Sequence, residues 1–124
     1  MSRKTLQKAR MRKVRHLRVR KSIRGDSVRP RLNVFRSLKH IYAQVIDDSA
    51  GATLLSLSTN TPEIRAQLEP EMDRRAQSRL VGRVLGEKMK AQGVSSVTFD
   101  RGGYQYHGRV KALAEGVREC GMEF

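Results

Sequence analysis

The segment from Arg31 to Thr59 has the sequence RLNVFRSLKHIYAQVIDDSAGATLLSLST, in which three short β-forming runs follow one another closely. Apolar, β-branched and aromatic residues recur within the runs at 31–37, 41–47 and 53–59, and turn-forming residues separate them. Because such short connections suit neighbouring antiparallel strands, the segment predicts a three-stranded meander.

Two segments beyond the meander have the apolar period of an amphipathic helix. Residues 74–92 place their apolar side chains on one face and are followed by Gly93, and residues 109–120 do the same before Gly121. A short run at 96–100 lies between the two helices and predicts a fourth strand.

Gly82 and Gly86 lie one turn apart inside the first of these helices. Interior glycines weaken a helix, so we expect each to lie at a close contact that a larger side chain would block. We expect them to let the helix approach the sheet closely, in preference to a close contact with another helix.

The predicted order is therefore β-β-β-α-β-α in a single α/β domain over residues 29–124. A helix between the third and fourth strands implies a right-handed crossover, so we expect a mixed four-stranded sheet with the fourth strand parallel to the first. Two packed helices complete a topology of the ribonuclease H-like type. Residues 60–73 contain two prolines and four acids, and they predict a loop with one turn of helix.

The charge of the chain is concentrated in its first quarter. The whole sequence has 26 Lys and Arg against 12 Asp and Glu, and residues 1–31 alone contain 13 of these cations with one acid, Asp26. Such a block binds polyanions, and nucleic acid is the first candidate. Residues 1–28 thus form a basic N-terminal arm, which we expect to become helical when RNA neutralises it.

Other partners and cofactors find little support in the sequence. No run approaches the roughly 20 apolar residues of a spanning helix, so we expect no membrane partner and an intracellular, cytoplasmic protein. Cys120 is the one cysteine, and the three histidines lack the short spacing of metal ligands. We therefore expect no metal and no cofactor.

The stretch FDRGGYQYHGR at 99–109 joins the fourth strand to the second helix and brings three glycines together with Arg101, His107 and Arg109. Backbone amides and cations around a helix N-terminus favour contact with phosphate, and Tyr104 and Tyr106 can stack on bases. A structural alternative stays open, in which Asp100 pairs with Arg101 or Arg109 or accepts from loop amides and the tyrosines pack as a lid.

Enzymatic alternatives lack the residues that they require. The glycines do not have the spacing of a phosphate loop or a dinucleotide fingerprint, and no Ser or Cys nucleophile accompanies His107 and Asp100. A metal-dependent nuclease needs carboxylates clustered over the strands, but the run at 31–37 contains none. We therefore expect no enzymatic activity.

The first two strands offer a second candidate RNA surface. Asn33 and Phe35 share one face of the first strand, and Tyr42 and Gln44 lie beside them in one register of the second. With Arg29, Arg31 and Arg36 around it, this face has the composition of an RNA platform. The alternative places Phe35 and Tyr42 in the core under a helix.

Two long stretches resemble one known family. The stretch RPRLNVFRSLKHIYAQVIDD at 29–48 and the stretch FDRGGYQYHGRVKALAEG at 99–116 closely resemble the bacterial form of ribosomal large-subunit protein eighteen, and the likeness extends over essentially the whole chain. Residues 61–73 fall where that family varies in length, and Cys120 stands where it more usually has a small residue.

The resemblance implies a structural ribosomal protein with no enzymatic activity. Its partners would be 5S rRNA, 23S rRNA and a neighbouring 5S-binding ribosomal protein, and its place would be the central protuberance of the large subunit. DNA or another RNA remains the alternative partner of a basic nucleic-acid-binding module. The candidate RNA-binding residues come from the arm, the first two strands and the 99–109 stretch: Arg3, Lys4, Arg10, Arg12, Lys13, Arg15, His16, Arg18, Arg20, Lys21, Arg24, Arg29, Arg31, Asn33, Phe35, Arg36, Lys39, His40, Tyr42, Arg101, Gly102, Gly103, Tyr104, Tyr106, His107, Arg109 and Lys111.

Overall fold

A computed structural model describes the backbone of residues 3–20 and 24–124 and the side chains of residues 5–15 and 24–124. Its centre is a four-stranded sheet of β1 (Arg31–Arg36), β2 (Ile41–Asp47), β3 (Ala52–Ser58) and β4 (Thr98–Asp100). The strand order is β3-β2-β1-β4. Strands β1, β2 and β3 pair antiparallel, and β4 lies parallel to β1. The predicted meander and mixed sheet are confirmed.

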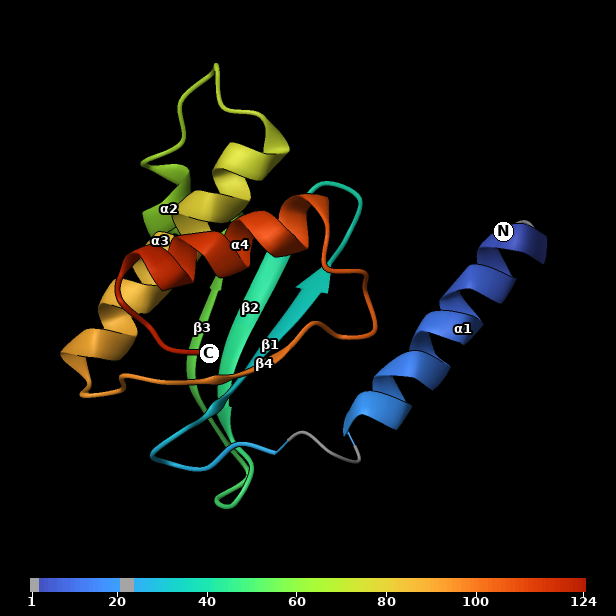
Figure 1. Ribbon diagram of the computed structural model, residues 1–124. Helices are drawn as coiled ribbons and strands as arrows, with labels where there is room; N and C mark the ends of the chain where they lie inside the picture. The colour runs from blue at the N-terminus through green and yellow to red at the C-terminus, as the bar shows by residue number, and fades with distance from the viewer. Residues whose placement is uncertain (1–2, 21–23) are drawn as a thin grey trace.

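Helices α3 (Arg74–Ala91) and α4 (Gly108–Glu119) cover one face of the sheet and pack side by side (Figure 1). The short helix α2 (Pro62–Arg65) follows β3, near its end. Helix α3 begins where the Asp73 carboxylate accepts a 2.8 Å hydrogen bond from the Ala76 amide, and Gly93 follows its end with a φ of +81°. Helix α2 is the single turn predicted within 60–73, so both main helices and this turn are confirmed.

The core lies between the sheet and α3 and α4. Leu32 and Val45 from the strands meet Leu85, Leu113 and Val117 from the helices, and all five are fully buried. These residues bury the apolar faces of α3 and α4 and one face of the sheet. Removing that apolar surface from water is the main source of stability in such a fold.

The close approach at Gly82 is made to α4, so the expected contact of these glycines with the sheet is wrong. A Cβ added at Gly82 would lie 2.1 Å from the carbonyl oxygen of Leu113, and one at Gly86 would lie 2.9 Å from the Cys120 sulfur. A Cβ added at Gly116 of α4 would in turn lie 2.2 Å from the Arg79 carbonyl oxygen. At these positions the backbones of α3 and α4 lie in direct contact. This is possible only because both helices have glycine there.

The other face of the sheet is open. Asn33 pairs with Gln44 and Phe35 with Tyr42, so the four side chains share that face as predicted. Phe35 remains 52% exposed, which excludes the alternative that places it in the core.

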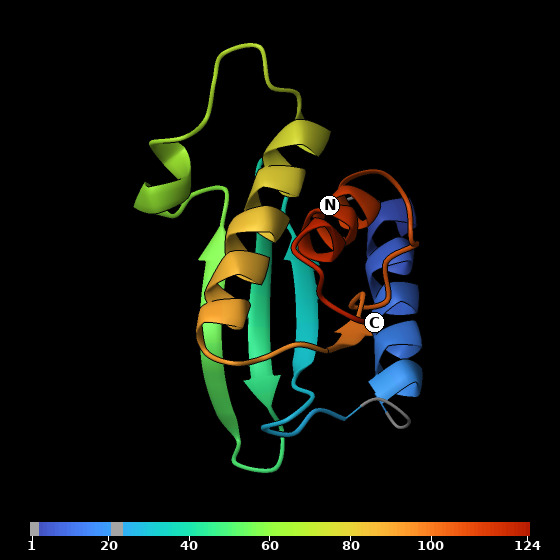
Figure 2. The same ribbon diagram turned by 60° about the vertical axis from the view of Figure 1, so that its left-hand side comes forward.

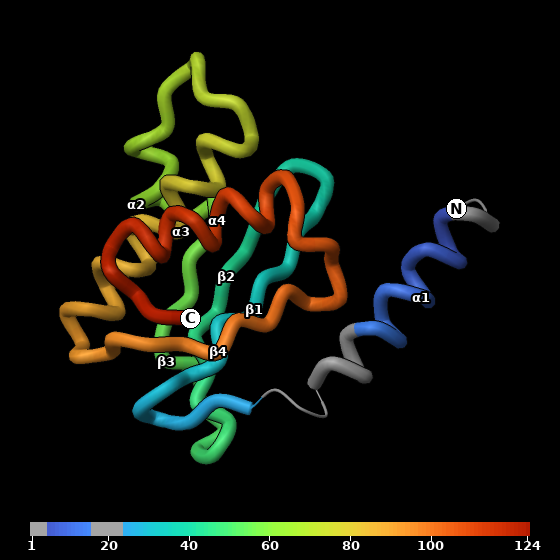
Figure 3. The backbone as a smooth tube through the Cα atoms, viewed as in Figure 1, coloured from blue at the N-terminus to red at the C-terminus, as the bar shows by residue number. Residues whose placement is uncertain are grey.

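Helix α1 (Arg3–Arg20) stands apart from the α3–α4 layer, beside the β4 edge and the loop that follows it (Figures 1 and 2). The tube view traces the chain from α1 through residues 24–30 into β1 (Figure 3). The backbone of residues 3–20 is helical, as the arm was predicted to be when bound to RNA; whether the helix requires RNA stays a prediction. No helix in the described part of the chain is long and apolar enough to span a membrane.

Candidate functional site

The loop at residues 101–107, which we call the Tyr104 loop, is fixed to the sheet by a buried carboxylate. Asp100 is fully buried, accepts a 3.0 Å hydrogen bond from the Gly102 amide and lies 2.8 Å from the Arg31 guanidinium. A Cβ at Gly102 would lie 2.5 Å from the Val34 carbonyl oxygen. The expected hydrogen bond to a loop amide is confirmed, but Arg31 is the ion-pair partner in place of Arg101 or Arg109.

Arg31 is a structural residue in this arrangement. Its side chain is 4% exposed and bridges Asp100 to Asp48, which accepts from Nε at 3.0 Å. The hydrogen bond to Asp48 is the main cause of a raised pKa of Arg31. Because its donors are engaged and shielded, Arg31 is not accessible to RNA in this conformation, and its expected contact with RNA stays a prediction.

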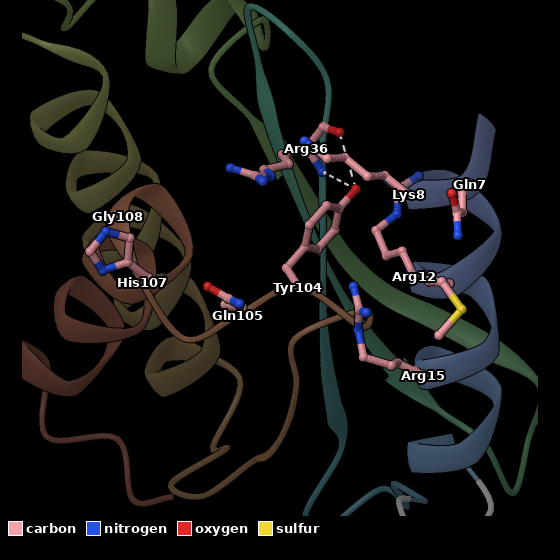
Figure 4. Close-up of a pocket in the computed structure, with 10 residues that line it drawn as sticks. Gln7, Lys8, Arg12, Arg15, Arg36, Tyr104, Gln105, His107 and Gly108 are labelled. Carbon is pink, nitrogen blue, oxygen red and sulfur yellow. Dashed lines mark hydrogen bonds between the residues drawn. The ribbon is translucent and has the colours of Figure 1, made fainter. Parts of the chain in front are cut away.

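Tyr104 closes the loop against β1. It is 6% exposed, and its hydroxyl accepts from the Arg36 amide at 3.3 Å and donates to the Arg36 carbonyl at 3.2 Å. The guanidinium carbons of Arg12 and Arg36 each lie 4.9 Å from the ring centroid (Figure 4). Such cation–π contacts cover the ring, so Tyr104 is not available for base stacking in this conformation, and its stacking on a base stays a prediction. The structural alternative holds here.

A hollow of about 630 Å³ separates α1 from the Tyr104 loop, and we call it the arm cleft. Arg15 holds α1 beside it by donating through Nε to the Gly103 carbonyl at 3.2 Å. Figure 4 shows side chains from α1, β1 and the Tyr104 loop around this space. No carboxylate lines the arm cleft, and its lining residues are Gln7, Lys8, Met11, Arg12, Arg15, Arg36, Tyr104, Gln105, His107 and Gly108.

A second hollow, of about 420 Å³, lies at the start of α3 and α4. Its lining residues are Arg75, Ala76, Arg79, His107, Gly108, Lys111, Ala112 and Glu115. Nearby, the pKa of Arg109 is lowered, first by partial burial and then by the positive charges of Arg36 and Arg74. These like charges gather near the first turn of α4, which contains no acid. Helix N-termini of this kind attract anions.

A third hollow, of about 200 Å³, lies on the open sheet face under α1. Its lining includes Arg12 and Lys13 from α1, Asn33 and Phe35 from β1, and Tyr104. The Asn33 Oδ1 is buried and has no hydrogen-bond partner among the described atoms. Phe35 lies against Tyr42, with ring centroids 5.9 Å apart.

The candidate residues divide into accessible, buried and undescribed groups. Arg10, Lys13, Arg15, Arg24, Arg29, Phe35, Arg36, Lys39, Arg101, Tyr106, His107 and Lys111 are exposed, and Arg12, Asn33, His40, Tyr42 and Arg109 are partly exposed. Arg31, Gly102, Gly103 and Tyr104 are buried. The side chains of Arg3, Lys4, His16, Arg18 and Arg20, and all of Lys21, lie outside the described residues.

Several residues that line these hollows were not predicted from the sequence. Lys8, Gln7 and Gln105 contribute to the arm cleft, and Arg75 and Arg79 to the second hollow. Lys8 belonged to the basic block and could have been included on that ground. The arginines at the start of α3 could also have been predicted as anion-binding residues. They place positive charge at a helix N-terminus, where acidic residues are usual.

The described residues contain no group of three His, Cys, Asp or Glu side chains that could hold a metal ion. Two features of the surface instead suit a nucleic acid. Cations line the arm cleft without a carboxylate, and exposed aromatic rings lie nearby. Cations neutralise phosphates, and exposed rings stack on unpaired bases. The arrangement is that of a nucleic-acid-binding surface.

Comparison with known proteins gives one consistent result. Residues 6–124 match the model of a family described as ribosomal L18 of archaea, bacteria, mitochondria and chloroplasts. A relative from Petrotoga mobilis, named large ribosomal subunit protein uL18, is 52% identical over 98% of each chain. Relatives of the same name from Thermomicrobium roseum and Alkaliphilus metalliredigens are 55% identical over 91% and 59% identical over 89% of each chain.

Proposed function

Because the chain belongs to the ribosomal L18 family, we propose that it binds 5S rRNA and helps attach it to 23S rRNA in the central protuberance of the large ribosomal subunit. The family consists of structural ribosomal proteins, so the chain is a structural ribosomal protein and not an enzyme. The choice of 5S rRNA rests on the resemblance of residues 29–48 and 99–116, together with the surface described above.

The observation that carries the proposal is the lining of the arm cleft. Lys8, Arg12, Arg15 and Arg36 converge there from α1 and β1 without a carboxylate among the lining residues. Cations held close together without acids repel one another, and the phosphates of a nucleic acid relieve that repulsion. Counterions released from the RNA then supply much of the affinity.

The specificity for one RNA comes from the shape of the folded domain. Phosphate contacts carry little sequence information, and regular RNA helices hide their major-groove edges from side chains. Arg101 is exposed at the start of the Tyr104 loop, which Asp100 fixes to the sheet, and Lys111 and the partly exposed Arg109 follow in α4. That fixed geometry suits one folded RNA better than a generic duplex.

Two exposed apolar side chains, at opposite ends of β1, are available for contact with a neighbouring ribosomal protein. Leu38, between β1 and β2, is 80% exposed, and Val28, before β1, is 78% exposed. Exposed apolar side chains of this size suit a protein neighbour better than a phosphate backbone.

Direct competition between 5S rRNA and duplex DNA at fixed salt tests the proposal. The protein is loaded with labelled 5S rRNA, and unlabelled 5S rRNA, unrelated RNA of equal length or duplex DNA is added. We expect 5S rRNA to compete at least about 100-fold better than the other two, because specific complexes exceed non-specific ones by three or more powers of ten in comparable systems. Equal competition by DNA or unrelated RNA would favour a general nucleic-acid-binding module.

A further inference from the structure

The three hollows adjoin one another along one side of the domain, because neighbouring hollows share lining residues. The arm cleft shares Arg12 and Tyr104 with the hollow on the open sheet face. It shares His107 and Gly108 with the hollow at the start of α3 and α4. We call the three hollows together the basic track; it runs from Phe35, under α1, to Lys111.

Charge along the basic track is almost entirely positive. Among its lining residues Glu115 is the one carboxylate, and it lies at the α4 end. Near the middle, the charges of Arg36 and Arg74 act on Arg109 strongly enough to help lower its pKa. A negatively charged chain along this path would relieve repulsion at successive points.

Helix α1 forms one wall of the track without belonging to the core. Its apolar side chains Leu6, Met11 and Val14 are 51%, 47% and 42% exposed, and the core contains none of the described α1 residues. Arg15 and Arg12 hold it to the Tyr104 loop by polar and cation–π contacts. A wall attached in this way can open and close at a much lower cost than a core helix.

The dimensions and the aromatic end favour a single strand. The arm cleft, at about 630 Å³, falls within the roughly 300–1,000 Å³ of pockets that take small ligands, which is room for one or two nucleotides of a strand. Phe35 presents an exposed ring at one end, where an unpaired base can stack. Beside it the Asn33 Oδ1 lacks a donor, which a base N–H or a ribose hydroxyl would supply.

We propose that the basic track holds a single RNA strand and that α1 closes over this strand as the outer wall of the arm cleft. The inference rests on the proposed binding of 5S rRNA and adds that an unpaired segment of the RNA is enclosed between the arm and the domain. This binding mode differs from one in which the arm lies on an outer surface of the RNA. An enclosed strand cannot dissociate until α1 moves away.

An order-of-addition crosslinking experiment tests the enclosure. In a Cys120→Ser background, Met11→Cys on α1 and Gln105→Cys on the Tyr104 loop place one thiol on each wall of the arm cleft. A short bis-maleimide then ties the walls together, either before or after 5S rRNA is added. The same protein without the reagent provides the reference affinity, and each single cysteine variant treated with the reagent controls for simple modification.

If the strand is enclosed, crosslinking before RNA addition should lower the association rate at least about 10-fold. Crosslinking after RNA addition should keep the RNA bound at salt that releases it from the untreated complex, since affinity otherwise falls steeply with salt. A second pair, Gln7→Cys with Gln105→Cys, should behave in the same way. Dissociation rates and retention on filters at rising salt provide the measurements.

The outcomes separate the two proposals. Failure of the wild-type protein to select 5S rRNA would contradict the proposed function itself. Selective binding by the wild type, with crosslinked pairs that associate and dissociate like their single-cysteine controls, would overturn the enclosure alone. Single-stranded and duplex oligonucleotides offered to the precrosslinked protein give a further check: inhibition confined to the single strand supports the track, and equal binding of both before and after crosslinking contradicts it.

Discussion

The α3–α4 layer and the α1 side of the molecule are held to the sheet by opposite means. Between α3 and α4, Gly82 and Gly116 let backbones touch, and apolar side chains fill the space to the sheet. On the α1 side, cations face one another across the arm cleft, and apolar residues of α1 stay exposed. The α3–α4 layer is stabilised by its own packing. The α1 side has excess positive charge, which a negatively charged partner would neutralise.

The loop that joins these two regions should show the largest effect on stability. Asp100→Ala removes the fully buried partner of Arg31 and leaves that guanidinium, which is 4% exposed, paired with Asp48. We expect a loss of about 3 kcal/mol, because the buried guanidinium loses one of its two carboxylate partners and the Gly102 amide loses its acceptor. Urea denaturation measures it. A loss below about 1 kcal/mol would show that the Tyr104 loop is not anchored through this pair.

Substitution in the close-packed layer should have the next largest effect. Gly82→Ala places a Cβ 2.1 Å from the Leu113 carbonyl oxygen, so α4 must shift. We expect about 2 kcal/mol of destabilisation, after the gain of roughly 1 kcal/mol from replacing an interior helical glycine. Gly86→Ala is the matched control. Its nearest neighbour is the Cys120 side chain, and the cost should be smaller. Equal effects in thermal unfolding would contradict the backbone-to-backbone contact.

The sequence predicted the elements of the first region well and their mutual contacts less well. Strand and helix periods are local, so the runs at 41–47 and 74–92 located β2 and α3 within one residue at either end. Which element lies opposite Gly82 depends on the crossing of α3 and α4, and residue spacing within one helix does not contain that information. The sequence allowed the register that places Phe35 beside Tyr42, but it did not decide whether their face is open or covered by a helix.

The site was harder to predict because burial depends on distant partners. Arg31 and Tyr104 stand among exposed cations in the sequence, yet Asp100 lies 69 residues from Arg31, and Arg36 lies 68 residues from Tyr104. Net charge identified the arm as a polyanion-binding segment. It could not reveal that the arm and the Tyr104 loop form two walls of one cleft, since that arrangement exists only in three dimensions.

The turn between β2 and β3 belongs to neither region and should give the smallest effect. The Ser49 hydroxyl donates to the Asp47 carboxylate at 2.5 Å, and this bond is the main cause of a lowered pKa of Asp47. The ionised Asp47 carboxylate therefore stabilises the fold at pH values above its ordinary pKa of about 3.9. This stabilisation is lost as the pH falls through the lowered pKa of the folded protein. Ser49→Ala should lower the melting temperature on the order of 1 °C at pH 6, and by less at pH 3. A difference that grows on acidification would contradict this sign.

The salt dependence of 5S rRNA binding tests most directly whether the α1 side is the RNA-binding side. Lys8→Gln, Arg12→Gln and Arg15→Gln remove three cations from the arm cleft. The matched control, Arg65→Gln, Arg83→Gln and Lys90→Gln, removes three exposed cations elsewhere. The slope of log affinity against log salt should become shallower by roughly 2 to 3 in the first variant, at about 0.7 to 0.9 per lost phosphate contact, and stay unchanged in the second. Equal slopes in the two variants, or a larger change in the control, would contradict the account.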